Sequence, residues 1–332
     1  MPATMIARTG FMALALAAVP AAALAKVSVS VPKIGNNVTV PPQSSISIKP
    51  QAVGTSPAPV QALAGPSNAS LDNLTVSQTF PAWQTTIAYE EKTGGGAQFF
   101  SNNARATTSV RWDQASQSYI VRETGNASKS YTLSAANRTS TTPTFTTYQT
   151  SSGGTTNTFR LFNPGAGNPV VQLTYASYGA WHQTTPGAGF QGAAKTSDTY
   201  FVYGIKTAAA DMPRIGTGTY SAIIDGTFVD KTGASTLSGT GGFIANFLGG
   251  TITFTADAVR TPASGPAVPI GLISGGGTIA FANSGFSASG SNGSYGMNLS
   301  GYFFGPAAAE IGAVFKLTGA GGSGNGVMIG KQ

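Results

Sequence analysis

Short runs in which apolar and polar residues alternate recur along most of the chain, and this pattern predicts β-strands. In residues 76–213 the runs are irregularly spaced, and a long loop is predicted over 133–156. The predicted strands here are TTIAYE (85–90), TTSVRW (107–112), QSYIVRE (117–123), TFRLFN (158–163), VVQLTYASY (170–178) and TYFVYGI (199–205). We interpret residues 76–213 as one β-rich domain with sizeable loops.

From residue 214 the runs are closer together and Gly-rich turns separate them. The predicted strands here are GTYSAIIDGT, STLSGTGGFIANF, GTITFTADAV, GGTIAFANSG, FSASGSNG, YGMNLSGYFF, IGAVFKL and GVMIG. Eight short strands at this spacing are typical of a small up-and-down antiparallel barrel, and glycines inside the strands suit its sharp coiling. The fold class predicted from the pattern is all-β, with an eight-stranded β-barrel over 214–332.

The first 75 residues lack the strand pattern. Arg8, a short apolar run and the small-residue site Ala23-Leu24-Ala25 predict a signal peptide over 1–25, cleaved before Lys26. The run is too short, and too interrupted by proline, for a membrane span, and no later stretch reaches about 20 apolar residues. Residues 26–75 are rich in Pro, Ser, Val and Gln, which predicts a disordered linker.

Composition narrows the function classes. Only 9% of residues are charged, and the net charge of +7 is spread without a Lys/Arg cluster, which argues against nucleic-acid binding. The chain has no cysteine, which excludes disulfides, thiolate metal sites and a lipidated cysteine. We therefore expect a secreted mature protein that is soluble without a transmembrane span.

Four segments carry a resemblance to a known family. They are GYFFGPAAAEIGAVF (301–315), TYFVYGIKTAAADMPRIGTGTYSAIIDG (199–226), YASYGAWH (175–182) and SGTGGFIANFLGGTITF (238–254). Together they resemble the transferrin-binding protein β-barrel domain family, including its transferrin-binding-protein-like solute-binding members. In the first segment, Pro306 and the alanines after it predict a single helical turn that caps one mouth of the barrel.

The resemblance implies a handle domain (76–213) followed by the barrel (214–332), at the surface of a Gram-negative cell or secreted from it. It implies a non-enzymatic binding protein that captures a solute, an iron source or haem, with an outer-membrane receptor or translocator as a further partner. Relatives capture host transferrin or bind haem, so a protein partner or an iron carrier is expected. The alternative is a structural or adhesion-type envelope protein that binds a protein partner without a small ligand.

The residues themselves offer little catalytic chemistry. His182 is the only histidine, no Gly-x-Ser-x-Gly elbow is present and the carboxylates are mostly isolated, so we predict no enzyme and no metal site. The candidate ligand residues are His182 as an axial ligand to haem iron, with Trp181 and Tyr178 as an apolar wall. The alternative is a solvated surface histidine beside core aromatics. Glu310 is expected to be structural, paired with a backbone amide or an arginine.

Overall fold

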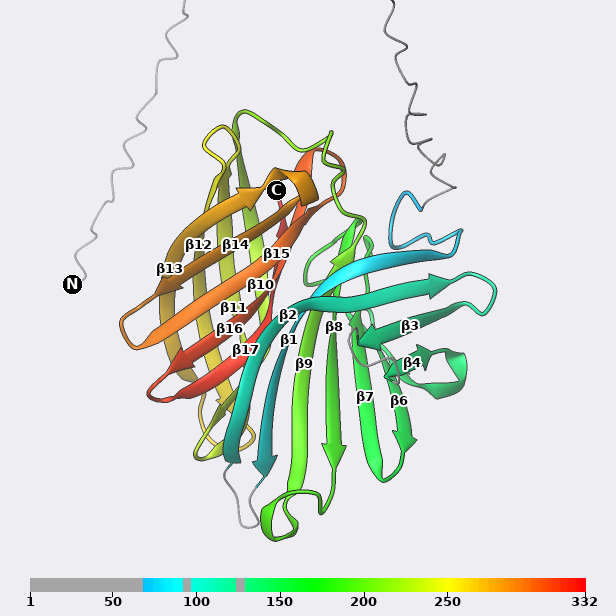
Figure 1. Ribbon diagram of the computed structural model, residues 1–332, viewed down its shortest axis with the longest axis vertical. Helices are drawn as coiled ribbons and strands as arrows, with labels where there is room; N and C mark the ends of the chain where they lie inside the picture. The colour runs from blue at the N-terminus through cyan, green and yellow to red at the C-terminus, as the bar shows by residue number, and fades with distance from the viewer. Residues whose placement is uncertain (1–67, 92–96, 124–128) are drawn as a thin grey trace, which may run out of the picture. The chain divides into compact units, whose positions relative to one another are not determined.

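The computed structural model describes residues 68–91, 97–123 and 129–332, and these form two antiparallel β-sheets (Figure 1). The all-β prediction is confirmed. The predicted signal peptide (1–25) and residues 26–67 of the predicted linker lie outside the described residues.

The described part begins inside the predicted linker. Asn68 is buried, and its side-chain oxygen accepts hydrogen bonds from the N–H groups of Thr75 and Val76 at 2.6 and 3.0 Å. Leu71 is also buried, and its N–H donates to the Thr174 carbonyl at 2.8 Å. The last residues of the predicted linker are therefore packed onto the first sheet.

The first sheet, which we call the handle, has nine strands in the order β4-β3-β2-β1-β9-β8-β7-β6-β5. Its strands are β1 (Gln78–Glu91), β2 (Ala97–Asp113), β3 (Ser118–Glu123), β4 (Ser130–Leu133), β5 (Arg138–Thr141), β6 (Phe145–Ser152), β7 (Thr155–Phe162), β8 (Ala176–Thr185) and β9 (Ala194–Gly204). A short 3₁₀ turn, η1 (Ala135–Asn137), joins β4 directly to β5, although these strands are at opposite edges of the sheet. The sheet is thus curved until it nearly closes.

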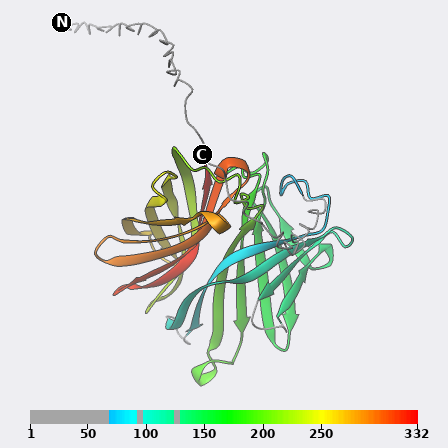
Figure 2. The same ribbon diagram turned by 45° about the horizontal axis from the view of Figure 1, so that its top comes forward.

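The second sheet is a closed barrel, and Figure 2 shows it beside the handle. Its strands are β10 (Thr217–Asp230), β11 (Gly233–Asn246), β12 (Thr251–Pro262), β13 (Val268–Ala280), β14 (Gly285–Ser291), β15 (Tyr295–Phe304), β16 (Glu310–Gly319) and β17 (Gly322–Lys331). Each strand pairs with the next, and β10 pairs with β17 to close the ring. Three further 3₁₀ turns occur in the described chain: η2 (Phe190–Gly192), η3 (Phe281–Asn283) and η4 (Pro306–Ala308). All eight predicted barrel strands have a counterpart, but the bounds of the fourth were wrong: GGTIAFANSG (276–285) overlaps β13 only over 276–280 and continues into η3.

Side chains fill the interior of the barrel. In β12 buried and exposed residues alternate, so that Ile252 and Phe254 point inward while Thr251 and Thr253 face solvent. Large inward side chains form one continuous core cluster: Tyr220, Phe228, Phe243, Phe254, Phe286, Phe303 and Phe315. The barrel is therefore a packed scaffold, as small barrels usually are.

One side of the barrel is covered by the handle. Six consecutive residues of β16 and seven of β17 are buried, which alternation with solvent cannot produce. Their outward-facing Val314, Val327 and Ile329 pack against Tyr200 and Val202 of the handle in a single apolar cluster. Burying this apolar surface holds the two sheets together.

Two handle predictions were wrong. The loop predicted over 133–156 contains β5 and β6, whose Thr- and Ser-rich sequences carry little apolar signal. The strand predicted over 170–178 starts only at Ala176, and the N–H groups of Thr174 and Tyr175 before it donate to the Glu310 side chain.

The turn after β15 also differs from its prediction. It is the short 3₁₀ turn η4, in which Ala307 and Ala308 have φ of 51° and 58° and so are left-handed, which alanine does not favour. Tertiary contacts hold it there: the Ala308 carbonyl accepts hydrogen bonds from the Tyr220 hydroxyl at 2.7 Å and the Gln332 amide at 3.0 Å. Ala308 belongs to the barrel core, so the turn does cover one mouth.

Candidate functional site

Polar side chains also join the handle to the barrel. Arg160 of β7 donates to the Asp225 carboxylate of β10 at 2.7 Å, and the Tyr178 hydroxyl of β8 donates to the same oxygen at 2.9 Å. Burial and the Asp225 charge raise the pKa of Tyr178, so its hydroxyl keeps the proton that it donates. These hydrogen bonds hold the handle and the barrel in one relative position.

Glu310 makes a second polar junction. At 4% exposure its carboxylate accepts hydrogen bonds from three consecutive backbone N–H groups of the handle: Thr174 at 2.6 Å, Tyr175 at 2.9 Å and Ala176 at 2.7 Å. Burial raises the pKa of Glu310, while these three donors and the Lys331 charge act in the opposite direction. The expected pairing with a backbone amide is present, and it anchors the segment that leads into β8.

Between the two sheets lies a cavity of about 360 Å³, which we call the seam cavity. Handle strands β8 and β9 supply its ionisable groups, and the barrel supplies small residues of β10, β11 and the end of β12. The lining residues are His182, Asp198, Thr227, Ala234, Ser235, Thr236, Thr261, Pro262 and Ala263.

His182 and Asp198 face each other across the β8–β9 pair, as register partners. His182 Nδ1 lies 2.7 Å from Asp198 Oδ1, and His182 Nε2 lies 2.9 Å from the Thr184 hydroxyl. The other Asp198 oxygen accepts a hydrogen bond from the Tyr89 hydroxyl at 2.9 Å. The imidazole is 47% exposed, whereas the Asp198 side chain is 11% exposed, so a buried carboxylate orients an accessible ring.

This geometry defines what the imidazole can do. The hydrogen bond to Asp198 raises the pKa of His182, with burial acting against it and the Asp198 charge adding to it. In the neutral ring, a proton on Nδ1 that is donated to Asp198 leaves Nε2 as an acceptor. The Thr184 hydroxyl donates to Nε2 in this structure, and a ligand that binds there would displace that hydroxyl. Metal-binding histidines commonly donate their other ring N–H to a carboxylate in this way, which fixes the tautomer of the imidazole.

The structure does not bring the three predicted ligand residues together. The Trp181 side chain lies on the face of β8 opposite to His182, where it is 6% exposed. Its ring stacks on Phe159 with 5.2 Å between the centroids, and its indole N–H donates to the Asn157 side-chain oxygen. Tyr178 shares the His182 face but is buried in the handle–barrel interface. The predicted apolar wall for a porphyrin is therefore not assembled beside His182, and the residues present do not fit haem held in that way.

Sequence reasoning missed Asp198, the residue that positions the imidazole. The sequence does contain a pattern that could have found it: a short Gly-rich segment (186–193) separates two strand-like runs, which predicts a hairpin. Such a hairpin places His182 opposite a residue near 198. In the part of the chain that the structure describes, no three His, Asp or Glu side chains gather closely enough to hold a metal ion. Within the same residues, no helix is long and apolar enough to cross a membrane.

The chain was compared with known proteins. No protein-family model matches it, and a search of curated proteins gives no match.

Solved structures do resemble it in fold. A transferrin-binding protein B double mutant from Haemophilus parasuis matches 71% of this chain at 18% identity and a TM-score of 0.42, and this chain spans about half (47%) of that protein's length. A transferrin-binding protein B mutant from Actinobacillus pleuropneumoniae matches 76% of this chain and 99% of its own, at 12% identity and a TM-score of 0.39. The N-lobe of lactoferrin-binding protein B from Moraxella bovis gives the same coverage and identity at a TM-score of 0.38. The likeness is one of fold alone.

Proposed function

We propose that this chain is a non-enzymatic binding protein of the Gram-negative cell envelope, secreted or held at the surface, which captures an iron-bearing solute in the seam cavity. The observation that carries the proposal is the His182–Asp198 pair. A buried carboxylate holds Nδ1 of an accessible imidazole, so Nε2 can bind a ligand when the Thr184 hydroxyl turns away from it. The signal-like N-terminal sequence supports a location outside the cytoplasm.

The size and lining of the cavity narrow the ligand. About 360 Å³ lies at the small end of ligand pockets, and apart from His182 and Asp198 the lining is small and neutral. A compact ferric chelate fits these features better than a porphyrin between aromatic walls. The iron is cargo in this proposal, and His182 contacts it while the chelator supplies the other ligands, because the described chain offers no cluster of three ligating side chains.

Titration with ferric citrate and, in parallel, with hemin tests the proposal. We expect the wild-type chain to bind ferric citrate with a shift of its iron absorbance, and His182→Ala to lose binding while its circular dichroism is unchanged. Gln183→Ala is the matched control, because the neighbouring side chain points to the opposite face of β8. Hemin binding that gives a Soret band abolished by His182→Ala assigns haem as the iron source. If neither compound binds in a His182-dependent way, the seam cavity is not an iron site.

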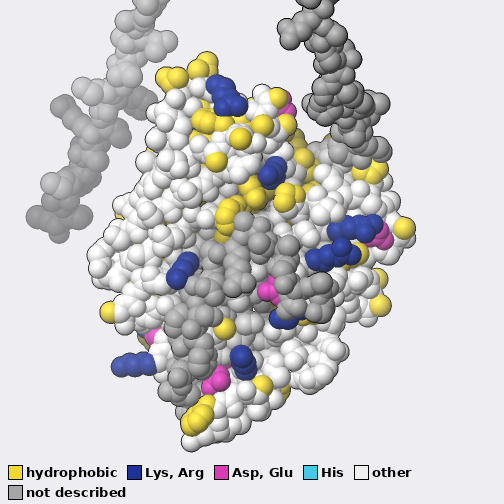
Figure 3. Space-filling view, in the orientation of Figure 1, with side chains coloured by type: hydrophobic (Ala, Val, Ile, Leu, Met, Phe, Trp, Pro, Cys, Tyr) yellow, Lys and Arg dark blue, Asp and Glu magenta, His cyan; other side chains and the backbone are white. Residues whose placement is uncertain are grey.

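A second candidate function, capture of a protein partner, is favoured by one surface feature. Ile215 and Leu248 are 75% and 77% exposed, and they are adjacent because the Phe247 N–H donates to the Gly216 carbonyl at 3.1 Å. Figure 3 shows hydrophobic side chains gathered at this upper end of the body. Exposed apolar groups at one barrel mouth are suited to docking.

Sedimentation of the pure protein with outer-membrane vesicles tests this second candidate. The double variant Ile215→Ser, Leu248→Ser should lose retention on the vesicles, whereas Leu272→Ser, at a residue that is 60% exposed on β13, should not. Equal retention of all three proteins would remove this surface from consideration.

A further inference from the structure

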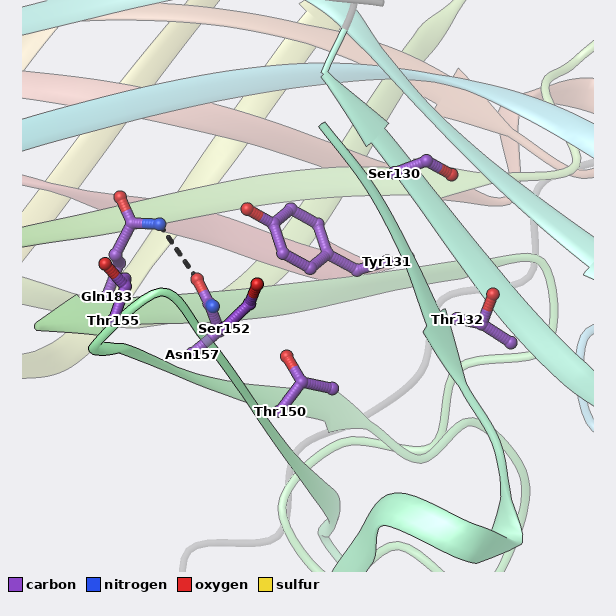
Figure 4. A pocket seen from close by; sticks show the side chains of 8 residues that line it. All are labelled: Ser130, Tyr131, Thr132, Thr150, Ser152, Thr155, Asn157 and Gln183. Carbon is purple, nitrogen blue, oxygen red and sulfur yellow. Dashed lines mark hydrogen bonds between the residues drawn. The ribbon is translucent and has the colours of Figure 1, made fainter. Parts of the chain in front are cut away.

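A second cavity lies where the handle sheet fails to close. Strand β4 pairs only with β3, and β5 pairs with β6 only from Thr146 to Tyr148, so the second half of β6 has no partner on that side among the described strands. Between these two edges is a cavity of about 440 Å³, which we call the handle-edge cavity (Figure 4). It is lined by Ser130, Tyr131, Thr132, Thr150, Ser152, Thr155, Asn157 and Gln183.

The lining has a uniform chemistry. Every one of the eight side chains carries a hydroxyl or an amide, and none is charged. Hydroxyls and amides both donate and accept hydrogen bonds, so the wall presents donors and acceptors side by side. Such a wall matches a ligand whose own groups do the same and carry no charge.

One of these side chains has a buried polar atom without a partner, and another is held by its neighbours. The Thr150 hydroxyl is buried and has no hydrogen-bond partner within the described chain. Asn157 is 3% exposed, and its Oδ1 accepts hydrogen bonds from Trp181 Nε1 at 3.0 Å and Gln183 Nε2 at 2.9 Å. Buried polar atoms normally find partners, so the unpaired Thr150 hydroxyl at this cavity points to a ligand that supplies one.

An aromatic ring completes the wall. Tyr131 is held by ring contacts with Trp181 at 4.7 Å and Phe159 at 5.1 Å. In Figure 4 the hydroxyl oxygens of Thr150 and Ser152 point toward the side of the cavity where the Tyr131 ring lies. The cavity therefore combines a fixed apolar ring with hydroxyls and amides around it.

We propose that the handle-edge cavity binds a neutral carbohydrate, one or two sugar rings in size. Sugar hydroxyls both donate and accept, sugar rings carry an apolar C–H face that packs on an aromatic ring, and neither needs a charged partner. A volume of about 440 Å³ lies within the range of roughly 300–1,000 Å³ that small-molecule pockets occupy. This site is separate from the seam cavity, and it goes beyond the proposed function.

Titration with glucose, galactose, N-acetylglucosamine and cellobiose, followed by calorimetry and tryptophan fluorescence, tests this proposal. Trp181 reports on the site because its indole donates to Asn157. Thr150→Val is the decisive variant, since it keeps the shape and removes the hydroxyl. We expect at least one sugar to bind, and its affinity to fall by about 10-fold in Thr150→Val, while the melting temperature stays equal or rises because a buried unpaired hydroxyl is gone.

Two control variants isolate the site. Thr253→Val makes the same change on the solvent face of β12, and His182→Ala removes the seam imidazole; both should bind the sugar as the wild type does. Failure of every sugar to bind at about 10 mM, a range that covers weak ligands, overturns the proposal. Unchanged affinity in Thr150→Val also overturns it. So does preferential binding of an extended neutral peptide, which would assign the two unpaired edges to strand addition.

Discussion

Gly312 offers a sharp test of how the barrel is joined to the handle. This buried residue of β16 faces the handle, and a Cβ added to it would lie 2.6 Å from Val202 Cγ2 of β9. Ile329 and Phe304 would be 3.3 Å away on the other sides. Val202 is itself fully buried, so it cannot simply swing into solvent. The change Gly312→Ala therefore forces the two sheets apart or strains the side chains between them.

The expected cost follows from this geometry. Overpacking a dense core by one methyl group costs about 1–3 kcal/mol of unfolding free energy. Gly296→Ala is the matched control: it lies in β15, and its Cβ would meet nothing closer than 3.9 Å. There, replacing glycine within a strand should stabilise the protein by about 0.5–1 kcal/mol. The expected changes in unfolding free energy of the two variants thus differ in sign as well as in size.

A second substitution tests the cause. Val202→Ala removes the clashing methyl groups and should cost about 2 kcal/mol alone, from lost burial and the cavity left behind. In the double variant the methyl group added at position 312 occupies part of that space, so the combined cost should be smaller than the sum by about 1 kcal/mol. This coupling is absent if the residues do not touch.

Equilibrium unfolding in urea, followed by circular dichroism and tryptophan fluorescence, measures all four variants against the wild type. Contact between Gly312 and Val202 is contradicted if Gly312→Ala is as stable as Gly296→Ala, or if the costs of Gly312→Ala and Val202→Ala are additive. Either result would mean that β9 does not pack on β16 in solution.

Three further predictions concern other parts of the chain. The hydrogen bond to Asp198 raises the pKa of His182, so protonation of this histidine stabilises the folded protein. This contribution to the unfolding free energy is fully present below the unfolded-state pKa of about 6.5 and is lost as pH rises through the higher folded-state pKa. Urea unfolding between about pH 5 and 8 should show this loss, and His182→Gln should abolish it. Ala307→Gly, at a φ of 51°, should raise stability by about 1 kcal/mol, and Ala308→Pro, at 58°, should lower it by more than about 3 kcal/mol, both read from urea midpoints. The isolated fragment 214–332 should fold as a barrel by circular dichroism yet self-associate in gel filtration, because the apolar outer face of β16 and β17 is uncovered; an unfolded fragment would contradict this.

The barrel could be predicted from local pattern alone. Its strands alternate with a period of two, and Gly-rich turns separate neighbours that also pair, so local pattern and nearest-neighbour topology agree. Along β12, for example, the alternation of Thr251, Ile252, Thr253 and Phe254 is enough to assign which side chains face inward.

Long-range packing, by contrast, sets the handle edges and the turn at η4. Strands β5 and β6 are rich in Thr and Ser and form because a curved sheet offers them neighbours, which their own sequence does not signal. Ala307 and Ala308 are left-handed because contacts from distant strands outweigh alanine's own preference.

The candidate sites also depend on tertiary structure. A sequence shows that Trp181 and His182 are neighbours, but strand geometry sends them to opposite faces, one into the handle core and the other into the seam cavity. The Asp198 carboxylate reaches the imidazole through strand pairing, and the handle-edge cavity exists only because β4 and β6, far apart in pairing order, curve toward each other. Alternation along a strand is a local property that sequence carries, whereas which strands meet depends on the summed packing of the whole sheet.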